Sequence, residues 1–435
     1  MPEFVRARRI MRHYYIPVWL KPALAFAVNG ALYGSLLTRY PEIADRVGAS
    51  EVTFGVVLFA AALGGMIGSV AAPLLVRKFG EVGATATAGC GYALLTISVA
   101  SAPELVLLGT ALFLMGFVDG LHDVSMNAFS VRIQQSTDTP IMGRVHATWS
   151  LSMAAAGVLG VTAAALGVPI VVHVAVVASA AFALQLTVLT RRYRDRSETA
   201  GPGSASANGP GAATHGSDRK RLRHVLLVLG VAALAVSYVE GPGQEWTGLL
   251  LSRGFQAETG VAASGTLAFT VGVVASRLVL DTLSRRVGVV VVSSVSSATI
   301  TLAMLAGLLT AVAGGPVWWA LAAIALAGLG AGPVFPLLYG AADQMSVRHG
   351  IAPATTASIV STLARIGTIS APIIVGPLTE TFGLSMVFVV IAAGGGLLLF
   401  SLPGALRVND ARSDDRPDDR PDDRGVAGGS PVRQT

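Results

Sequence analysis

The chain has 435 residues, of which 53% are hydrophobic and 13% are charged, and its mean hydropathy is +0.65. Soluble globular proteins carry about 25% charged residues, because they must present a polar surface to water. This composition excludes a soluble globule and favours a protein whose outer surface meets lipid. The formal net charge is +6, but Lys and Arg form short clusters between apolar runs, so we expect no nucleic-acid partner.

Twelve apolar segments approach the roughly 20 residues that a helix needs to cross the hydrocarbon layer of a bilayer. In chain order they cover about residues 17–38, 52–76, 82–101, 104–129, 143–166, 169–190, 223–251, 259–281, 287–311, 316–341, 353–378 and 383–405. They predict an all-α integral membrane protein of twelve transmembrane helices. An even number of crossings places both ends of the chain on the same side.

Basic residues gather in alternate connections between these segments. The connections on the side of the termini hold most of the Lys and Arg, whereas the opposite connections hold little beyond Arg39, Arg46 and Arg253. Cytoplasmic loops retain an excess of Lys and Arg. The pattern therefore predicts a multi-pass protein of the plasma (inner) membrane with both termini in the cytoplasm.

A polar stretch divides the apolar part into two halves. The run from Gly201 to Ala213 contains only Gly, Pro, Ala, Ser and Asn, a composition typical of a flexible linker. We therefore predict a six-helix bundle at 1–190, a flexible cytoplasmic linker at 191–222, a second six-helix bundle at 223–406 and a disordered cytoplasmic tail at 407–435. A basic turn follows both the second helix (76–80) and the eighth (284–288), which indicates an internal repeat.

The fourth predicted helix carries the densest group of polar residues. Asp119, His122, Asp123, Met126 and Asn127 follow the i, i+3, i+4, i+7, i+8 spacing of one helix face. Ionisable groups in a span cost about 2.5–3.5 kcal/mol on insertion scales and usually face a cavity or a partner. The stripe therefore predicts proton transport or substrate binding by the two Asp residues, with His122 as a relay. A buried network that fixes helix packing is the alternative.

The seventh predicted helix holds a second candidate site. Glu240 precedes Gly241-Pro242-Gly243, which we expect to interrupt the helix because Pro lacks a donor and Gly loosens the backbone. A carboxylate beside a broken helix is a binding-site candidate in a carrier. Glu245 and Trp246 follow, and we expect them to anchor the outer membrane interface.

Further candidates lie on other helices. Arg365 falls near the middle of the eleventh segment, where a lone cation needs a carboxylate or an anionic ligand; a structural ion pair is the alternative. Polar or aromatic residues that we predict to line a cavity or to meet the Asp119 stripe are Asn29, Tyr33, His146, Phe335 and Tyr339. Gly330, Gly332, Pro333 and Pro336 indicate a kinked tenth helix.

The two halves, the central loop and the repeated basic hairpin resemble the major facilitator superfamily over residues 15–406. In that superfamily, helices 1, 4, 7 and 10 line a central cavity, and rocking of the two bundles gives alternating access. The resemblance implies that the cavity is lined by Asn29, Tyr33, Asp119, His122, Glu240, Phe335 and Tyr339.

Shorter motifs look like the fucose-permease-like branch, among them residues 123–127, Gly143-Arg144-Val145-His146, and Arg277-Leu278 with Asp281. The superfamily's basic hairpin also contains an Asp that helps to latch the cytoplasmic gate. Here Arg77 stands where that Asp would fall, and Asp281 lies four residues before the equivalent position in the second hairpin. The resemblance therefore implies, as a hypothesis, a gate formed by Arg77, Lys78, Asp281 and Arg285.

The favoured function is secondary active transport of a small solute by alternating access, coupled to protons, with a sugar or small polar metabolite as substrate. Proton-driven efflux of amphipathic drugs is the main alternative, followed by a non-transporting membrane sensor. No nucleotide-binding loop, paired Cys/His metal spacing or nucleophile elbow occurs. We therefore expect no enzymatic activity, no cofactor, no metal and a monomer.

Overall fold

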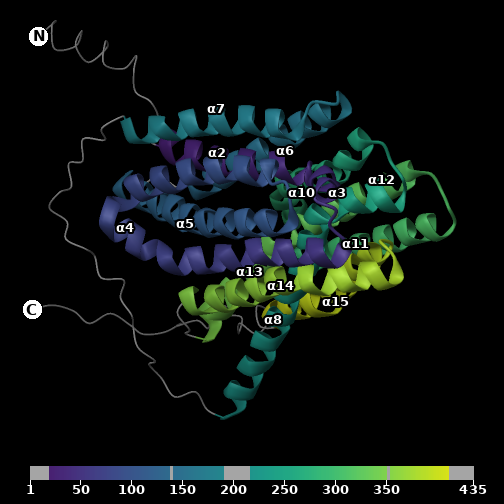
Figure 1. Cartoon of the computed structure of the whole chain (residues 1–435). Coiled ribbons are helices and arrows are strands. Elements are labelled where there is room, and N and C mark those ends of the chain that lie inside the picture. Colours follow the sequence, from purple (N-terminus) through teal and green to yellow (C-terminus); the bar gives the residue numbers. More distant parts are fainter. Residues whose placement is uncertain (1–18, 138–140, 191–215, 350–352, 411–435) are drawn as a thin grey trace, which may run out of the picture.

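The computed structural model describes residues 19–137, 141–190, 216–349 and 353–410, and the regular structure in these ranges is helical. The first half comprises α2 (Leu20–Leu37), α3 (Tyr40–Arg46), α4 (Glu51–Ser101), α5 (Leu105–Thr137), α6 (Met142–Ala165) and α7 (Ile170–Thr190) (Figure 1). The second comprises α8 (Gly216–Glu245), α9 (Thr247–Leu249), η2 (Leu250–Gly254), α10 (Thr259–Val287), α11 (Val289–Val312), α12 (Val317–Ala331), α13 (Val334–His349), α14 (Pro353–Phe382) and α15 (Met386–Asp410).

Ten stretches of the described chain are long and apolar enough to cross a membrane. One of them is α4, which crosses twice because it bends back at Gly80, and α2 adds a further apolar helix of 18 residues. The result is twelve crossings, six on each side of residues 191–215. The predicted all-α membrane protein with two six-helix bundles is confirmed.

The two basic hairpins have the same backbone geometry. Gly80, in the first, has φ 67° and ψ 169°, and Gly288, in the second, has φ 84° and ψ 150°. Glycine adopts positive φ without the steric cost of a Cβ atom. Each hairpin therefore turns at a glycine beside its basic pair, as the predicted repeat requires. Figure 1 shows the first of these turns, where α4 bends back at its label.

Two sequence expectations about helix boundaries are wrong. The helix α8 continues through Pro242 to Glu245, so Gly241-Pro242-Gly243 does not interrupt it. The break comes at Trp246, after which the chain forms the short α9 and a π-helical turn. In addition, α8 begins at Gly216, so residues 216–222 are helical and not linker. Residues 191–215 and 411–435, where we predicted a linker and a tail, lie outside the described ranges.

The tenth crossing is divided into two helices at the place where we predicted a kink. The helix α12 ends at Ala331, and α13 begins at Val334 after Gly332 and Pro333. Proline lacks the backbone donor that a continuous helix needs, and Pro336 stands four residues after Gly332. The Gly332 carbonyl therefore receives no N–H from that position and can accept a donor from another helix.

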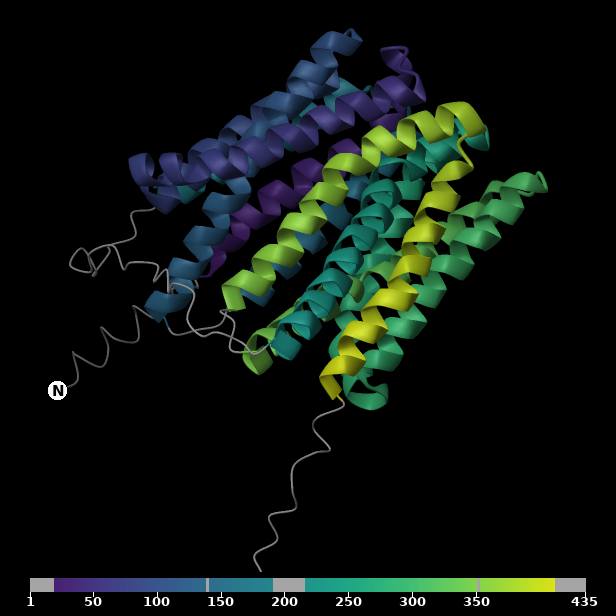
Figure 2. The same cartoon turned by 90° about the horizontal axis from the view of Figure 1, so that it is seen from below.

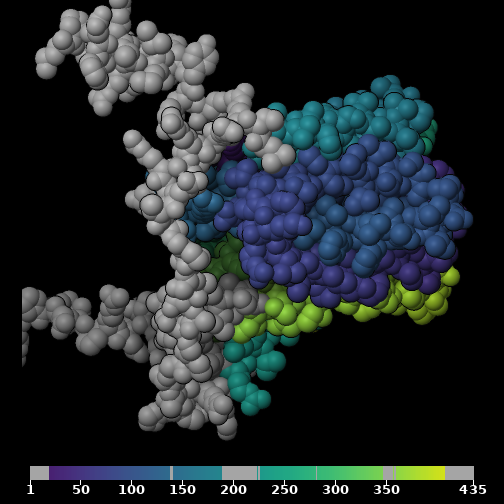
Figure 3. Space-filling model, turned by 60° about the vertical axis from the view of Figure 1, so that its left-hand side comes forward, coloured from purple at the N-terminus to yellow at the C-terminus, as the bar shows by residue number. Residues whose placement is uncertain are grey.

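The two bundles meet mainly through two helix pairs, α4 with α14 and α6 with α10, and α3 also contacts α9 and α10. In Figure 3 the purple-blue and yellow-green surfaces touch along the first of these seams. The approach is closest at the ends opposite the termini, where a Cβ atom on Gly376 would lie 2.8 Å from the carbonyl oxygen of Glu51. On the other pair, a Cβ atom on Gly260 would lie 2.8 Å from that of Ala165. Small residues at these points let the helix backbones pack directly.

At the side where α2 begins and α15 ends, the helix ends of the two bundles spread apart instead of touching (Figure 2). We call this the terminal side, and the closed ends the latch side. The molecule is thus asymmetric along the membrane normal.

Candidate functional site

A cavity of about 160 Å³ lies between the two bundles. Asp119 and Asp123 reach it from α5, Ser69 from α4, and Arg365 from α14 of the other bundle. The Nη1 atom of Arg365 donates to Ser69 Oγ at 3.3 Å. Three residues predicted independently therefore meet in one place, and the carboxylates that Arg365 was expected to need belong to the opposite bundle.

Asn29 fixes the position of the Asp119 carboxylate. Its Nδ2 atom donates to Asp119 Oδ1 at 2.7 Å, and its Oδ1 atom accepts a hydrogen bond from Trp149 Nε1 at 2.8 Å. Trp149, on α6, in turn stacks on Tyr33, with 6.4 Å between ring centroids. Asn29 is only 6% exposed, so both ends of its amide are used inside the bundle. The predicted cavity residues Asn29 and Tyr33 are joined by Trp149, which sequence analysis did not single out.

His122 lies behind the cavity and not in it. The side chain is fully buried, with Nδ1 3.3 Å from Asn29 Nδ2 and Nε2 3.4 Å from Gln185 Nε2. Gln185 Nε2 also donates to the backbone carbonyl of Thr85 at 2.8 Å. The single polar face predicted for the fourth helix is therefore divided, because the Asp residues face the other bundle and His122 faces the interior of its own.

The remaining members of the stripe serve local structure. Met126 is buried against Phe26, and Asn127 donates to the carbonyl and the Oδ1 atom of Asp123, one turn earlier on the same helix, at 2.9 and 3.1 Å. His146, on α6, packs edge-on against Phe26 and interacts electrostatically with Asp123. The predicted proximity of His146 to the stripe is confirmed.

In the second bundle, Glu240 is paired. Its Oε1 atom lies 3.1 Å from Nη2 of Arg277 on α10, and Arg277 Nε donates to the carbonyl of Gly332 at 3.1 Å. The break between α12 and α13 is therefore tied to the ion pair. Arg277 is missing from the predicted site residues, because its relation to Glu240 depends on the packing of two helices.

Two pairs of aromatic residues are in contact, one within the second bundle and one between the bundles. Tyr339 stacks on Phe335 with 6.3 Å between ring centroids. Trp246 is completely buried and packs edge-on against Phe54 of α4, with centroids 5.3 Å apart. The expected membrane anchor at Trp246 is therefore wrong, because the chain turns after Glu245 and directs the indole into the contact between bundles.

The residues of the predicted gate belong to the two basic hairpins. Arg77, Lys78 and Arg285 are exposed, and Lys78 Nζ lies 5.2 Å from the ring centroid of Phe79. The side chain of Asp281 lies outside the described part of the structure. A gate at the terminal side stays a prediction.

The latch side instead holds a polar contact that sequence analysis missed. Arg253, in η2, donates to Asp45 Oδ1 at 2.7 and 2.9 Å, to Glu51 Oε1 at 3.0 Å and to the Ala49 carbonyl at 2.9 Å. Burial lowers the pKa of Arg253, hydrogen bonds to the two carboxylates raise it, and the net change is upward. The guanidinium therefore stays charged. We call this contact the Arg253 latch.

A second contact reinforces this side. Glu380 Oε2, at the end of α14, accepts hydrogen bonds from Ser50 Oγ at 2.7 Å and from the backbone N–H of Val52 at 2.8 Å. A carboxylate is stabilised at a helix N-terminus, where the first N–H groups have no partner in the helix. The second bundle thus caps the start of α4.

Two six-helix bundles around a polar cavity, in contact at one end and spread at the other, define a membrane transporter. The chain belongs to the major facilitator superfamily, whose family model, described as Major Facilitator Superfamily, matches residues 22–356.

Curated and solved relatives agree with this assignment. The chain is 27% identical over 397 residues to the uncharacterized transporter y4wD of Sinorhizobium fredii, which covers 90% of this chain and 99% of that protein. Identity to the membrane protein MosC of Rhizobium meliloti is 23%, over 86% of each chain. The fold is similar to the nucleoside transporter NupG (D323A mutant), with a TM-score of 0.68, 14% identity, and coverage of 89% of this chain and 99% of that one. It is also similar to an inward-facing, unoccupied bacterial homologue of the human lysosomal transporter Spinster, with a TM-score of 0.63, 14% identity, and coverage of 92% and 98%.

Proposed function

We propose that the protein is a proton-coupled carrier of a small polar solute, such as a sugar, in the inner membrane, with both termini in the cytoplasm. The observation that carries the proposal is the shared cavity in which Asp119 and Asp123 of one bundle face Arg365 of the other. The residues proposed to bind substrate or proton are Asn29, Tyr33, Asp119, His122, Asp123, Asn127, His146, Glu240, Tyr339 and Arg365.

Proton coupling follows from the position of the acidic pair. Alternating access moves α5 and α14 relative to one another, so the attraction between the carboxylates and Arg365 differs between the two states. A proton bound to Asp119 removes one negative charge and thereby changes which state is favoured. A ligand shifts such an equilibrium only by its different affinity for the two states, and a proton on Asp119 meets that condition.

The polar solute is supported by the groups near the cavity. Carboxylates, a guanidinium and hydroxyls from Ser69 and Thr368 line it, and these groups form hydrogen bonds with sugar hydroxyls. Tyr33 lies within electrostatic range of both Asp119 and Glu240, which belong to different halves. The resemblance to the fucose-permease-like branch supports the same substrate class.

The test begins with ligand stabilisation of the purified protein by sugars, polar metabolites and amphipathic drugs. Proteoliposome uptake of the best polar ligand is then measured under an imposed pH gradient. We expect Asp119→Asn to abolish gradient-driven accumulation while exchange of labelled for unlabelled substrate persists. Glu104→Gln is the matched control, because Glu104 is exposed just before α5.

Undiminished accumulation in Asp119→Asn would exclude Asp119 as the proton carrier. Stabilisation by amphipathic drugs alone, together with their outward transport, would replace the polar solute by the efflux alternative.

A further inference from the structure

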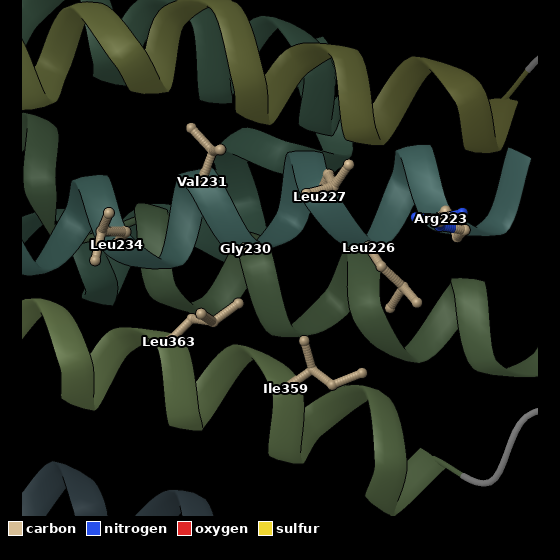
Figure 4. Close-up of a pocket in the computed structure, with 8 residues that line it drawn as sticks. All are labelled: Arg223, Leu226, Leu227, Gly230, Val231, Leu234, Ile359 and Leu363. Carbon is tan, nitrogen blue, oxygen red and sulfur yellow. The ribbon is translucent and has the colours of Figure 1, made fainter. Parts of the chain in front are cut away.

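A second hollow lies on the membrane-facing side of the second bundle, between α8 and α14. It is an apolar groove of about 510 Å³ lined by Arg223, Leu226, Leu227, Gly230, Val231, Leu234, Ile359 and Leu363 (Figure 4). Leu227 is 66% exposed and Val231 43%, so the groove is open at the surface of an apolar span. It shares no lining residue with the cavity that holds Asp119.

At Gly230 the side chain of Leu363 packs closely against the backbone of α8, because a Cβ atom there would lie 2.6 Å from Leu363 Cδ1. From Arg223 to Leu234 the groove follows α8 for about 16 Å at 1.5 Å per residue. This is about half of the roughly 30 Å hydrocarbon core, so the groove has the length of one acyl chain within one leaflet.

A positive charge stands at one end of the groove. Arg223 is exposed and lies three residues before the apolar span that begins at Leu226, and the sequence Arg219-Lys220-Arg221 precedes it. Four basic residues next to a spanning helix attract anionic lipids, and a guanidinium binds phosphate through two parallel hydrogen bonds. An apolar groove with a cation at one end therefore matches a phospholipid, in which an apolar acyl chain is joined through glycerol to a phosphate.

We propose that this groove binds an anionic phospholipid of the leaflet on the terminal side. One acyl chain lies along Leu227, Val231 and Leu234, and the phosphate meets Arg223. The inference does not depend on the substrate or on proton coupling.

The first bundle offers an internal comparison. A groove of about 500 Å³ lies between α4 and α5, lined by Thr53, Val56, Val57, Ala60, Leu105, Val106, Gly109, Thr110 and Phe113. It has a similar volume and apolar wall, but no charged residue lines it. It should accept an acyl chain without preference for the head group.

Native mass spectrometry of the full chain in non-ionic detergent tests the proposal. The protein is mixed with equal amounts of phosphatidylglycerol and phosphatidylcholine that have identical acyl chains. We expect retained phosphatidylglycerol on the wild type, and about a fivefold loss of that retention in Arg223→Gln, as expected for one basic residue near an anionic surface. Leu227→Trp, which fills the groove from an exposed position, should cause a similar loss.

Two matched variants control for charge and for bulk. Arg286→Gln removes an exposed cation at the end of α10, and Val56→Trp fills the groove of the first bundle, where Val56 is 53% exposed. Both should keep the preference of the wild type for phosphatidylglycerol over phosphatidylcholine, although Val56→Trp should retain less of both lipids. Free glycerol phosphate should not compete, because it lacks the acyl chain.

Equal retention of the two lipids by the wild type would overturn the proposal. So would an unchanged Arg223→Gln, an equal loss in Arg286→Gln, or competition by free glycerol phosphate. Thermal melting in the same detergent establishes that each variant is folded, since all four substitutions are at exposed positions.

Discussion

The Arg253 latch joins the two bundles at one side of the membrane, and Arg253→Ala removes every contact that this side chain makes. The substitution deletes ion pairs to Asp45 and Glu51 and the hydrogen bond to the Ala49 carbonyl. All three partners belong to the first bundle, whereas Arg253 belongs to the second. The variant should therefore weaken the latch-closed state relative to the latch-open state.

The size of the effect follows from the exposure of the partners. Arg253 is 24% exposed, Glu51 19% and Asp45 52%, so solvent screens the Asp45 pair most. Exposed ion pairs contribute about 0.2–1 kcal/mol each, and a hydrogen bond from a charged donor adds about 1 kcal/mol when it is partly screened. We expect a loss of about 1.4–3 kcal/mol, which changes the ratio of closed to open molecules by about 10- to 160-fold.

Spin labels across the bundles measure this ratio. Leu166, after α6, and Val312, at the end of α11, are 75% and 77% exposed and belong to different bundles. Labels at Leu166→Cys and Val312→Cys, in a Cys90→Ser background, should report a longer distance in a larger fraction of Arg253→Ala molecules.

Arg46→Ala is the matched control, because Arg46 lies nearby and donates to the Ala100 carbonyl at 2.6 Å within its own bundle. An unchanged distance distribution in Arg253→Ala would refute the latch. An equal shift in Arg46→Ala would show that any lost cation at this side has the same effect.

Two other contacts give measurable expectations. Asn29→Leu leaves the indole N–H of Trp149 without an acceptor and Asp119 without its donor. We therefore expect thermal unfolding to show a loss of about 1–3 kcal/mol of stability. The control Asn127→Leu should cost less, because the contacts of Asn127 lie within its own helix. Arg277→Met leaves Glu240 unpaired and should destabilise by up to about 3 kcal/mol, below the range for fully buried pairs because Arg277 is 31% exposed. Adding Glu240→Gln should recover part of that loss, and an additive double variant would show that the pair does not interact.

The spans were predictable because a helix surrounded by lipid must be apolar along most of its length. Apolar length located the crossings, and the basic pairs beside Gly80 and Gly288 located both hairpins. The break at Gly332-Pro333 was also readable, whereas the break expected at Pro242 was not. A proline inside a helix is tolerated when neighbouring helices satisfy the freed backbone group, and that depends on tertiary packing.

The sequence indicated which residues belong to the site, but not which of them lie next to one another. Helical spacing placed Asp119 and Asp123 on one face, and the cost of burying charge marked Arg365 and Glu240. Spacing does not reveal that Asp123 lines the same cavity as Arg365, 242 positions away, or that Glu240 pairs with Arg277. Uncharged members such as Trp149 and Gln185 carry no sequence signal, because a tryptophan or a glutamine in a span has many uses.

The contacts between the bundles differ in kind from those within them. At the latch side, the bundles are held together by close packing at glycines, by the ion pairs of Arg253 with partly exposed carboxylates, and by Glu380 at the start of α4. Trp246 is the large buried side chain at this contact. Exposed ion pairs contribute little individually, and water replaces their hydrogen bonds when they part. A seam built this way separates at a cost of a few kcal/mol, which is within the range that binding of a solute or a proton supplies. The buried network of Asn29, Trp149 and His122 lies within one bundle and would be costly to break, so each bundle should move as a unit.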